Sequence, residues 1–344
     1  MKGDRMAGII GYGFYLPKYR IKAEEYIKAW GIFNAPNVIE KSVPAYDEDS
    51  ITMGVEAARN GLKWFNIPSK DISAIFFAST SSPYNEKLSS ATIAYAIGST
   101  PNTFTTDITD TPRAGVNALF SAIDYVKARE GYAIIIASDA PFANPDAVYE
   151  HPFGAGAAAF IVGSGNNLLA RFESSFCITK ETLGERFRRN GEKFIRDLGL
   201  RTISYEPVIT ELLNGLTKNI NCSIEEINYI AIQQPDGRSI YNTLKKQGIH
   251  TDVYKDGIVA DKLGDLGVAS PFFSMIKFLE KNEKRKRIAM IGYGSGGIAI
   301  SFITEGSKKL LLKRLFEKDT DNKIYINYVQ YLKQKRFLSS FKGE

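Results

Sequence analysis

The chain repeats itself once, at a shift of 155 residues, and this repeat limits the folds open to it. The segment Asp71 to Phe77 (DISAIFF) aligns with Glu226 to Ile232 (EINYIAI), and Tyr132 to Ser138 (YAIIIAS) aligns with Arg287 to Tyr293 (RIAMIGY). Each of these segments is an apolar run with the length of a β-strand. We therefore expect two copies of one unit that contains buried strands.

Helices alternate with these strands. The segments Ile51 to Phe65 and Ala114 to Arg129 place apolar residues three or four positions apart, as amphipathic helices do. Continuous apolar strands between such helices predict a sheet covered on both faces. The expected fold is a duplicated α/β sandwich with layers α-β-α-β-α. We place its N-terminal half at residues 1–170, its C-terminal half at 171–306, and a basic C-terminal extension at 307–344.

The whole net charge of +6 lies in this extension. Ten of the 44 Lys and Arg residues and four of the 38 Asp and Glu residues fall between Ser307 and Glu344, so the rest of the chain is balanced. A balanced body excludes a protein built to coat nucleic acid. Nucleic-acid binding through the extension alone is a minor alternative.

The extension also contains an apolar stripe. A helix over this segment would place Tyr325, Tyr328, Val329 and Leu332 on one face. A stripe of this kind packs on its own domain in most proteins. In a second interpretation it docks on an acidic partner surface, and Tyr325, Tyr328 and Leu332 are the docking residues that this interpretation predicts.

Cysteine and histidine are rare. Cys177 and Cys222 are too few and too far apart for a disulfide framework or a CxxC metal site, and we predict no metal centre. No nearby cysteine accompanies His151 or His250, so nothing locates a Cys/His catalytic pair. We find neither a signal peptide nor a run of roughly 18 apolar residues. A cytoplasmic protein outside the membrane is expected.

Two further motifs have simple structural interpretations. Gly292, Gly294 and Gly297 fit GxGxxG, but another apolar strand follows where a dinucleotide site needs a helix. We therefore predict a turn between two strands. In ITDTPRAG, Asp110 or Thr111 is placed as a helix N-cap and Pro112 as the first helical residue.

The order of motifs along the chain is similar to that of archaeal 3-hydroxy-3-methylglutaryl-CoA synthases, members of the thiolase superfamily. The matching segments include GIIGYGFYLPKYRI, DITDTPRAG, GAGAAAFIVG, RFRRNGE, QQPDG, LGDLGVAS, YGSGG and YINYVQYLKQK. The resemblance covers nearly the whole length and implies the thiolase-like form of the layered sandwich already expected from the repeat.

The resemblance also implies a chemistry. Family members load an acetyl group onto a cysteine at a helix start, and then join its methyl carbon to acetoacetyl-CoA with the help of a glutamate and a histidine. In this sequence the cysteine position is Pro112, the glutamate position is Thr80 and the histidine position is Gln233. Pro112 supplies no nucleophile, and neither the Thr80 hydroxyl nor the Gln233 amide exchanges protons near neutral pH. The resemblance therefore predicts that the condensing chemistry is lost.

Four neighbouring family positions suggest how much binding is retained. Arg238 stands where a lysine contacts a coenzyme A phosphate, and Ser295 in YGSGG is kept. Asp265 replaces an asparagine and places a negative charge where a thioester carbonyl would be polarised, while Pro152 replaces a substrate-contacting threonine. These four residues are the predicted coenzyme A or substrate contacts.

Our leading hypothesis is a synthase-like protein without condensing activity that serves as a structural or regulatory subunit. The resemblance implies a homodimer, or a heteromer with an active paralogue, and also implies acetoacetyl-CoA thiolase and a small zinc-ribbon/OB-fold protein as partners. Coenzyme A or an acyl-CoA is the one ligand expected. The alternative is an active CoA-dependent acyltransferase of the mevalonate pathway with altered chemistry, using the hydroxyl of Thr111, Ser79 or Ser81.

Overall fold

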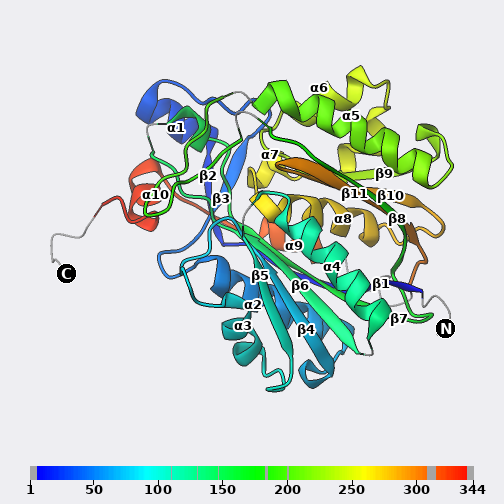
Figure 1. The fold of residues 1–344 in the computed structure, drawn as a ribbon. Helices are drawn as coiled ribbons and strands as arrows, with labels where there is room; N and C mark the ends of the chain where they lie inside the picture. Colours follow the sequence, from blue (N-terminus) through cyan, green and yellow to red (C-terminus); the bar gives the residue numbers. More distant parts are fainter. Residues whose placement is uncertain are drawn as a thin grey trace.

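The computed structural model describes residues 6–109, 111–129, 131–145, 147–182, 185–199, 201–307 and 315–338. One sheet of nine strands runs through both halves in the order β5-β4-β6-β7-β1-β8-β11-β10-β9 (Figure 1). The strands of the N-terminal half are β1 (Ala7–Tyr15), β4 (Ile72–Ala78), β5 (Phe104–Ile108), β6 (Tyr132–Asp139) and β7 (Gly156–Ser164). Those of the C-terminal half are β8 (Ala170–Thr179), β9 (Tyr229–Ile232), β10 (Arg287–Tyr293) and β11 (Gly296–Thr304).

The two halves of this sheet form two β layers, and the helices form three layers outside and between them. Helices α4 (Ala114–Ala128) and α8 (Ser270–Glu280) lie in the middle layer and contact strands of both halves. On the outside, α2 (Ser50–Phe65) and α3 (Ser89–Ile97) cover the N-terminal strands, and α5 (Arg201–Asn219) and α6 (Ser239–Lys246) cover the C-terminal strands (Figure 1). The predicted α-β-α-β-α order is confirmed.

The two halves of the sheet meet at β1 and β8. Only two residue pairs join these strands, Gly8 with Arg171 and Ile9 with Ala170. A side chain at position 8 could not fit, because its Cβ would lie 2.2 Å from the carbonyl oxygen of Ala170. The predicted division at residue 170 coincides with the start of β8; whether the halves are separate domains stays a prediction.

The repeat corresponds to equivalent elements. β4 and β6 occupy the places in the N-terminal half that β9 and β10 occupy in the C-terminal half, and α4 corresponds to α8. The copies differ between α6 and α8. There the described residues 247–269 form only short helical turns, including α7 (Ala260–Leu263), and no strand equivalent to β5. The poor match of the two copies in this interval therefore reflects a real structural difference.

Helix α4 begins two residues later than predicted. Pro112 is not the first helical residue, because residues 111–113 form a turn that precedes Ala114, and the N-cap Arg113 makes no side-chain cap. The turn is pressed against the β10–β11 hairpin: a Cβ on Gly294 would lie 2.2 Å from Thr111 Oγ1 and 3.1 Å from Pro112 Cδ. Asp110, the other predicted N-cap, lies outside the described residues. The hairpin itself confirms the predicted turn between strands.

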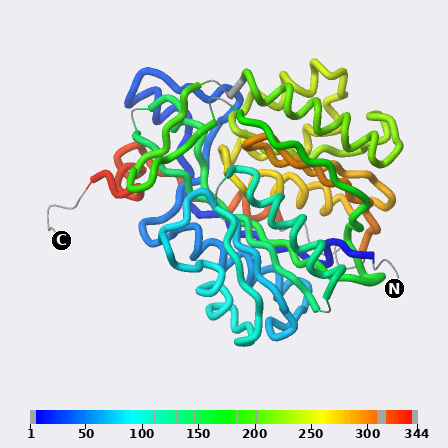
Figure 2. Tube along the Cα trace, viewed as in Figure 1, coloured from blue at the N-terminus to red at the C-terminus, as the bar shows by residue number. Residues whose placement is uncertain are grey.

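A smaller sheet and the C-terminal helix complete the fold. The strands β12 (Ile324–Tyr325), β2 (Tyr19–Lys22) and β3 (Glu40–Val43) form this sheet. Helices α1 (Ala23–Trp30) and α10 (Tyr328–Gln334) pack beside it, and α9 (Leu315–Asp321) precedes β12. Figure 2 shows the end of the described chain, in red, beside the blue α1 segment and far from the start of β1. Within the described ranges, no helix is both long and apolar enough to cross a bilayer.

The prediction that the apolar residues of the extension share one helical face is partly wrong. Tyr325 belongs to β12 rather than to a helix, and the inward residues of α10 are Tyr328 and Tyr331. Tyr331 donates a hydrogen bond to Glu150, which also pairs with Lys41 at 3.0 Å. This buried ion pair anchors the tail, and its polar partners could not be identified from the spacing of apolar residues.

The close contact between α4 and the segment around the start of α8 gives a test of the packing. A Cβ on Gly115 of α4 would lie 2.7 Å from the carbonyl oxygen of Val268 and 2.8 Å from the Phe272 ring. Gly115→Ala should therefore lower the free energy of unfolding by about 1–3 kcal/mol through overpacking, although alanine at an exposed helix position would raise it by about 1 kcal/mol. Urea unfolding measures the change, with Ser121→Ala on the exposed face of α4 as the control. A stabilised Gly115→Ala variant would contradict the packing.

Candidate functional site

A buried carboxylate lies where β4 and β6 end. Asp139 closes β6, and its oxygens accept hydrogen bonds from the hydroxyls of Ser79, Thr80 and Ser81 at 2.9–3.1 Å. The backbone N–H groups of Thr80 and Val268 donate to the same carboxylate, at 2.7 and 3.0 Å. A carboxylate has about four lone-pair sites, so these donors fill its accepting capacity. Asp139 thus joins the end of β4 to the turn that precedes α8.

One arginine links this carboxylate to the second half. Arg186 lies 3.6 Å from Asp139 and 3.2 Å from Asp265, and it also donates to Thr80 Oγ1 at 3.2 Å. The side chains of both acids are at most 3% exposed and that of the arginine is 7% exposed. The guanidinium offsets the negative charge that the sequence predicted at Asp265. Two carboxylates and one cation form a buried network across the two halves.

Pro112 and Gln233 lie side by side. Assigned from its hydrogen-bonding partners, the Gln233 amide nitrogen donates to the carbonyl oxygens of Pro112 and Tyr293 at 3.2 Å each. The adjacent Thr111 Oγ1 is buried and has no hydrogen-bond partner among the described residues. The structure therefore brings the predicted cysteine and histidine positions together, and a proline ring and an amide occupy them.

A carboxyl that the sequence did not predict faces this turn. Glu185 accepts hydrogen bonds from the backbone N–H and the hydroxyl of Ser295, in the β10–β11 hairpin. Burial raises the pKa of Glu185, and burial also lowers the pKa of the neighbouring Arg113, which donates to the Ile178 carbonyl at 3.0 Å. The retained Ser295 is therefore held by an acid from the segment that also carries Arg186.

Pro152 and Arg238, the other two predicted coenzyme A or substrate contacts, differ in their surroundings. Pro152 is buried, and its carbonyl oxygen accepts from the Asp265 N–H at 2.6 Å. Arg238 is exposed at the start of α6, and its guanidinium makes no hydrogen bond within the described part of the chain. Pro152 thus belongs to the buried network, whereas Arg238 remains available to a ligand.

Neither cysteine lies beside a histidine. Cys177 is exposed on β8, and Cys222 is half-buried just before the short helical turn Ile224–Glu226. His151 stacks on Phe33 with ring centroids 5.4 Å apart, and His250 is exposed beside Asp252. Over the described ranges, no three Cys, His, Asp or Glu side chains are grouped to hold a metal ion.

The predicted docking residues are exposed to different degrees. Tyr328 is buried against Tyr26, with ring centroids 5.1 Å apart. Leu332 is half-buried, while Tyr325 is 48% exposed and donates its hydroxyl to Glu40. Tyr325 is therefore the most accessible of the three. Residues 308–314 and 339–344, which carry half of the basic residues of the extension, lie outside the described residues.

Comparison with known proteins decides the family. A hydroxymethylglutaryl-CoA synthase of Thermococcus onnurineus is 34% identical, with 98% of each chain covered. One from Methanopyrus kandleri is 32% identical, covering 96% of this chain and 97% of the relative, and one from Aeropyrum pernix is 35% identical, covering 85% and 83%. The chain belongs to the hydroxymethylglutaryl-CoA synthase family. No family model matches it.

Solved structures of the synthase family share the fold. A crystal structure of HMG-CoA synthase complexed with CoA superposes with a TM-score of 0.87 at 18% identity, covering 98% of this chain and 93% of that one. MvaS in complex with 3-hydroxy-3-methylglutaryl coenzyme A gives 0.85 at 16% identity, with coverage of 100% and 94%. The thiolase-like architecture is confirmed, and the archaeal synthases are relatives over nearly the full length.

Sequence reasoning missed Asp139, Arg186 and Glu185. A signal existed for two of them: Asp139 is an acid at the end of a long apolar strand, and Arg186 lies in RFRRNGE, a segment singled out as a family landmark. Their pairing could not be predicted, because the segment 185–199 follows no periodic pattern and its position depends on tertiary packing. Glu185 and Arg186 face different partners although they are adjacent in the chain.

The buried network predicts a defect that depends on charge. Arg186→Met would remove the cation that pairs with Asp139 and Asp265, and the folded state should lose about 3–5 kcal/mol. Urea unfolding measures this effect.

Two further variants sharpen this test. Asp265→Asn in the Arg186→Met background removes one of the two buried carboxylate charges and should restore part of the stability. Arg189→Met changes an exposed neighbour and should leave the midpoint unchanged. No recovery of stability in the Asp265→Asn, Arg186→Met double variant would refute the role of charge.

Proposed function

We propose that this member of the synthase family no longer performs the condensation and acts as a structural or regulatory subunit. The observation that carries the proposal is the contact between Pro112 and Gln233 at the start of α4. A covalent acyl-enzyme needs a sulfur or oxygen nucleophile, and a proline ring has neither. A general acid/base needs a group that titrates near neutral pH, and an amide does not.

The alternative chemistry lacks a free base. Ser79 and Ser81 are the hydroxyls closest to the Thr80 position, and both donate to Asp139. That carboxylate also accepts from the backbone N–H groups of Thr80 and Val268 and lies beside Arg186, so it already joins several segments in a structural network. Thr111 Oγ1 has no hydrogen-bond partner at all within the described chain. These contacts favour a positioning role for the hydroxyls.

Binding is more easily retained than catalysis in this arrangement. Arg238 is exposed and keeps a cation near the end of β9, and Ser295 remains in the hairpin beside Pro112. Archaeal synthases are 32–34% identical to the chain over nearly its whole length. We therefore propose coenzyme A or an acyl-CoA as the one retained ligand, which the protein would hold without transforming it.

A subunit needs a surface for its partners, and strand β5 offers one. It forms an outer edge of the nine-stranded sheet, where β4 is its one partner among the described strands. Phe104 on this strand is 50% exposed, and Tyr95 on the adjacent α3 is 91% exposed. An open strand edge with exposed aromatic rings favours pairing with another chain. We propose a homodimer or a heteromer with an active paralogue, with acetoacetyl-CoA thiolase and a zinc-ribbon/OB-fold protein as further partners.

If the condensing activity is lost, this protein should form no product in an assay in which an active synthase does. Radiolabelled acetyl-CoA and acetoacetyl-CoA should give no 3-hydroxy-3-methylglutaryl-CoA with this protein, because Pro112 cannot carry the acetyl group. The Methanopyrus kandleri synthase, measured in the same assay, should form product. Sustained turnover by this protein, above a blank without enzyme, would contradict the proposal.

The subunit role predicts a defined complex. The protein purified from its native cells should carry a thiolase, a synthase paralogue or both at a fixed stoichiometry, which mass spectrometry measures. Phe104→Glu should weaken an assembly that uses the β5 edge, because it places a charge on the exposed ring position. Phe187→Glu, at an exposed aromatic position far from β5 in the sequence, serves as the control. A protein that purifies alone would argue against a subunit.

A further inference from the structure

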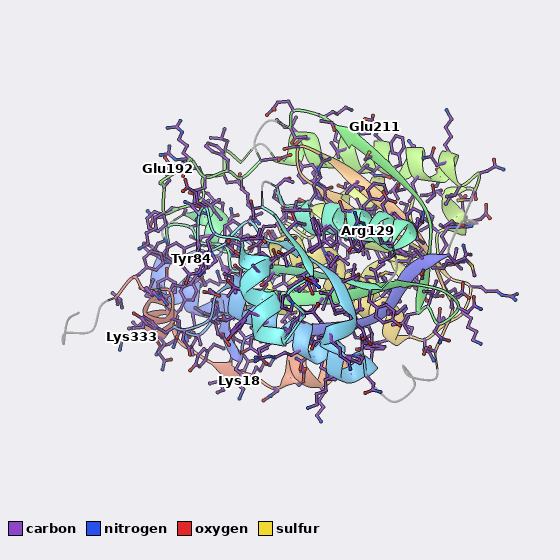
Figure 3. The ribbon with its side chains drawn as sticks, turned by 60° about the horizontal axis from the view of Figure 1, so that its bottom comes forward. Lys18, Tyr84, Arg129, Glu192, Glu211 and Lys333 are labelled. Carbon is purple, nitrogen blue, oxygen red and sulfur yellow. The ribbon has the colours of Figure 1, made fainter. Side chains whose placement is uncertain are left out.

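A cavity of about 510 Å³ opens where the C-terminal helix meets the N-terminal half. Its walls come from the loops after β3, β4 and β6, from the segment 188–193, and from the end of α10. Figure 3 shows Tyr84, Glu192 and Lys333, which mark three of these regions, at the same end of the molecule. Pockets of about 300–1,000 Å³ are typical of small-molecule sites.

Four cations line this cavity, which we call the basic groove: Arg188, Lys193, Lys335 and Arg336. Three of them are exposed, and Lys335 is buried. None of the four forms an ion pair with any residue that the structure describes. Their concentration in one concave surface gives the basic groove a positive potential.

The contacts of these cations leave their charge uncompensated. Lys335 Nζ donates to the Pro141 carbonyl at 2.9 Å, and Arg336 donates to the Tyr46 carbonyl at 2.7 Å. Lys193 Nζ lies 5.3 Å from the centroid of the Phe142 ring. Carbonyl oxygens and ring faces orient a cation without neutralising it. Burial lowers the pKa of Lys335 to about 8, an effect that the charge of Glu150 partly opposes.

Two acids also line the basic groove, but both are already engaged. Asp49 caps α2, accepting from the backbone N–H groups of Ile51 and Thr52 at 2.9 and 2.8 Å. Glu48 accepts from the Ala45 N–H at 2.7 Å and from the Tyr15 hydroxyl. Neither acid lies within ion-pair distance of the four cations. The basic groove therefore remains cationic.

We propose that the basic groove binds an organic phosphate, whose phosphate group is held by Arg188, Lys193 and Arg336. Arginine and lysine together provide the charge-assisted donors that phosphate oxygens accept. Arg188 and Ser82 also line the adjoining cavity of about 480 Å³ that contains Thr80. A ligand held in the groove by its phosphate would therefore extend toward the Thr80 end of the candidate site. Arg238 and Ser295, the predicted coenzyme A contacts, do not line either cavity.

Calorimetric titration of the full chain tests this site. The probes are pyrophosphate, ADP and coenzyme A, at about 0.15 M salt so that weak surface attraction is screened. Saturable binding of pyrophosphate is expected, and Arg188→Ala with Lys193→Ala should weaken it by about tenfold or more. The tighter of ADP and coenzyme A identifies the source of the phosphate group.

A control variant removes two positive charges outside the basic groove. Arg189→Ala with Lys246→Ala changes an exposed neighbour of Arg188 and an exposed lysine of α6, neither of which lines the groove. This variant should bind the probes as the unmodified protein does. Absence of saturable binding to all three probes would overturn the proposal, and so would an equal loss in both double variants. These results do not depend on whether the protein condenses acyl groups, since no assay of turnover is involved.

Discussion

The close approach of α4 to the turn that precedes α8 is the constraint on which the rest of the structure depends. The two segments pack so tightly that position 115 has no room for a Cβ beside the Val268 carbonyl. This packing places the start of α4 against the β10–β11 hairpin and the turn before α8 against Asp139. Residues from four separate segments thereby meet at one site. The thiolase-like scaffold shared with the synthase family is thus intact around this site.

The buried polar groups around Asp139 hold separate segments of the chain together. Asp139 accepts from three consecutive hydroxyl residues and from the second half of the chain, and Arg186 pairs with it and with Asp265. Breaking a buried network of this kind costs more than its formation contributes, because a single unpaired charge is strongly disfavoured. Gly267 is part of the same arrangement, since a Cβ there would lie 2.0 Å from an Asp139 oxygen. The site favours rigidity over proton transfer.

The sequence predicted the fold more fully than the site. The 155-residue repeat and the apolar periodicity gave the layers and the paired strands, because burial on a regular element leaves a local pattern. The start of α4 was placed too early, since contact with Gly294 rather than local capping sets it. The tail was assigned one helical face, yet Tyr331, Glu150 and Lys41 anchor it through a buried ion pair. Partners such as Arg186 and Asp139 lie 47 residues apart in the chain, and only tertiary packing brings them together.

The central claim is that Pro112 offers no nucleophile, so the protein carries no acyl group at the start of α4. Intact-protein mass measurement after incubation with acetyl-CoA tests it most directly, with Pro112→Cys as the matched control that returns a thiol to this helix start. The account predicts an unchanged mass for the natural sequence and the addition of one acetyl group to the variant. A stable acetyl group on the natural sequence, mapped to Thr111 or to Ser79, Thr80 or Ser81, would contradict it.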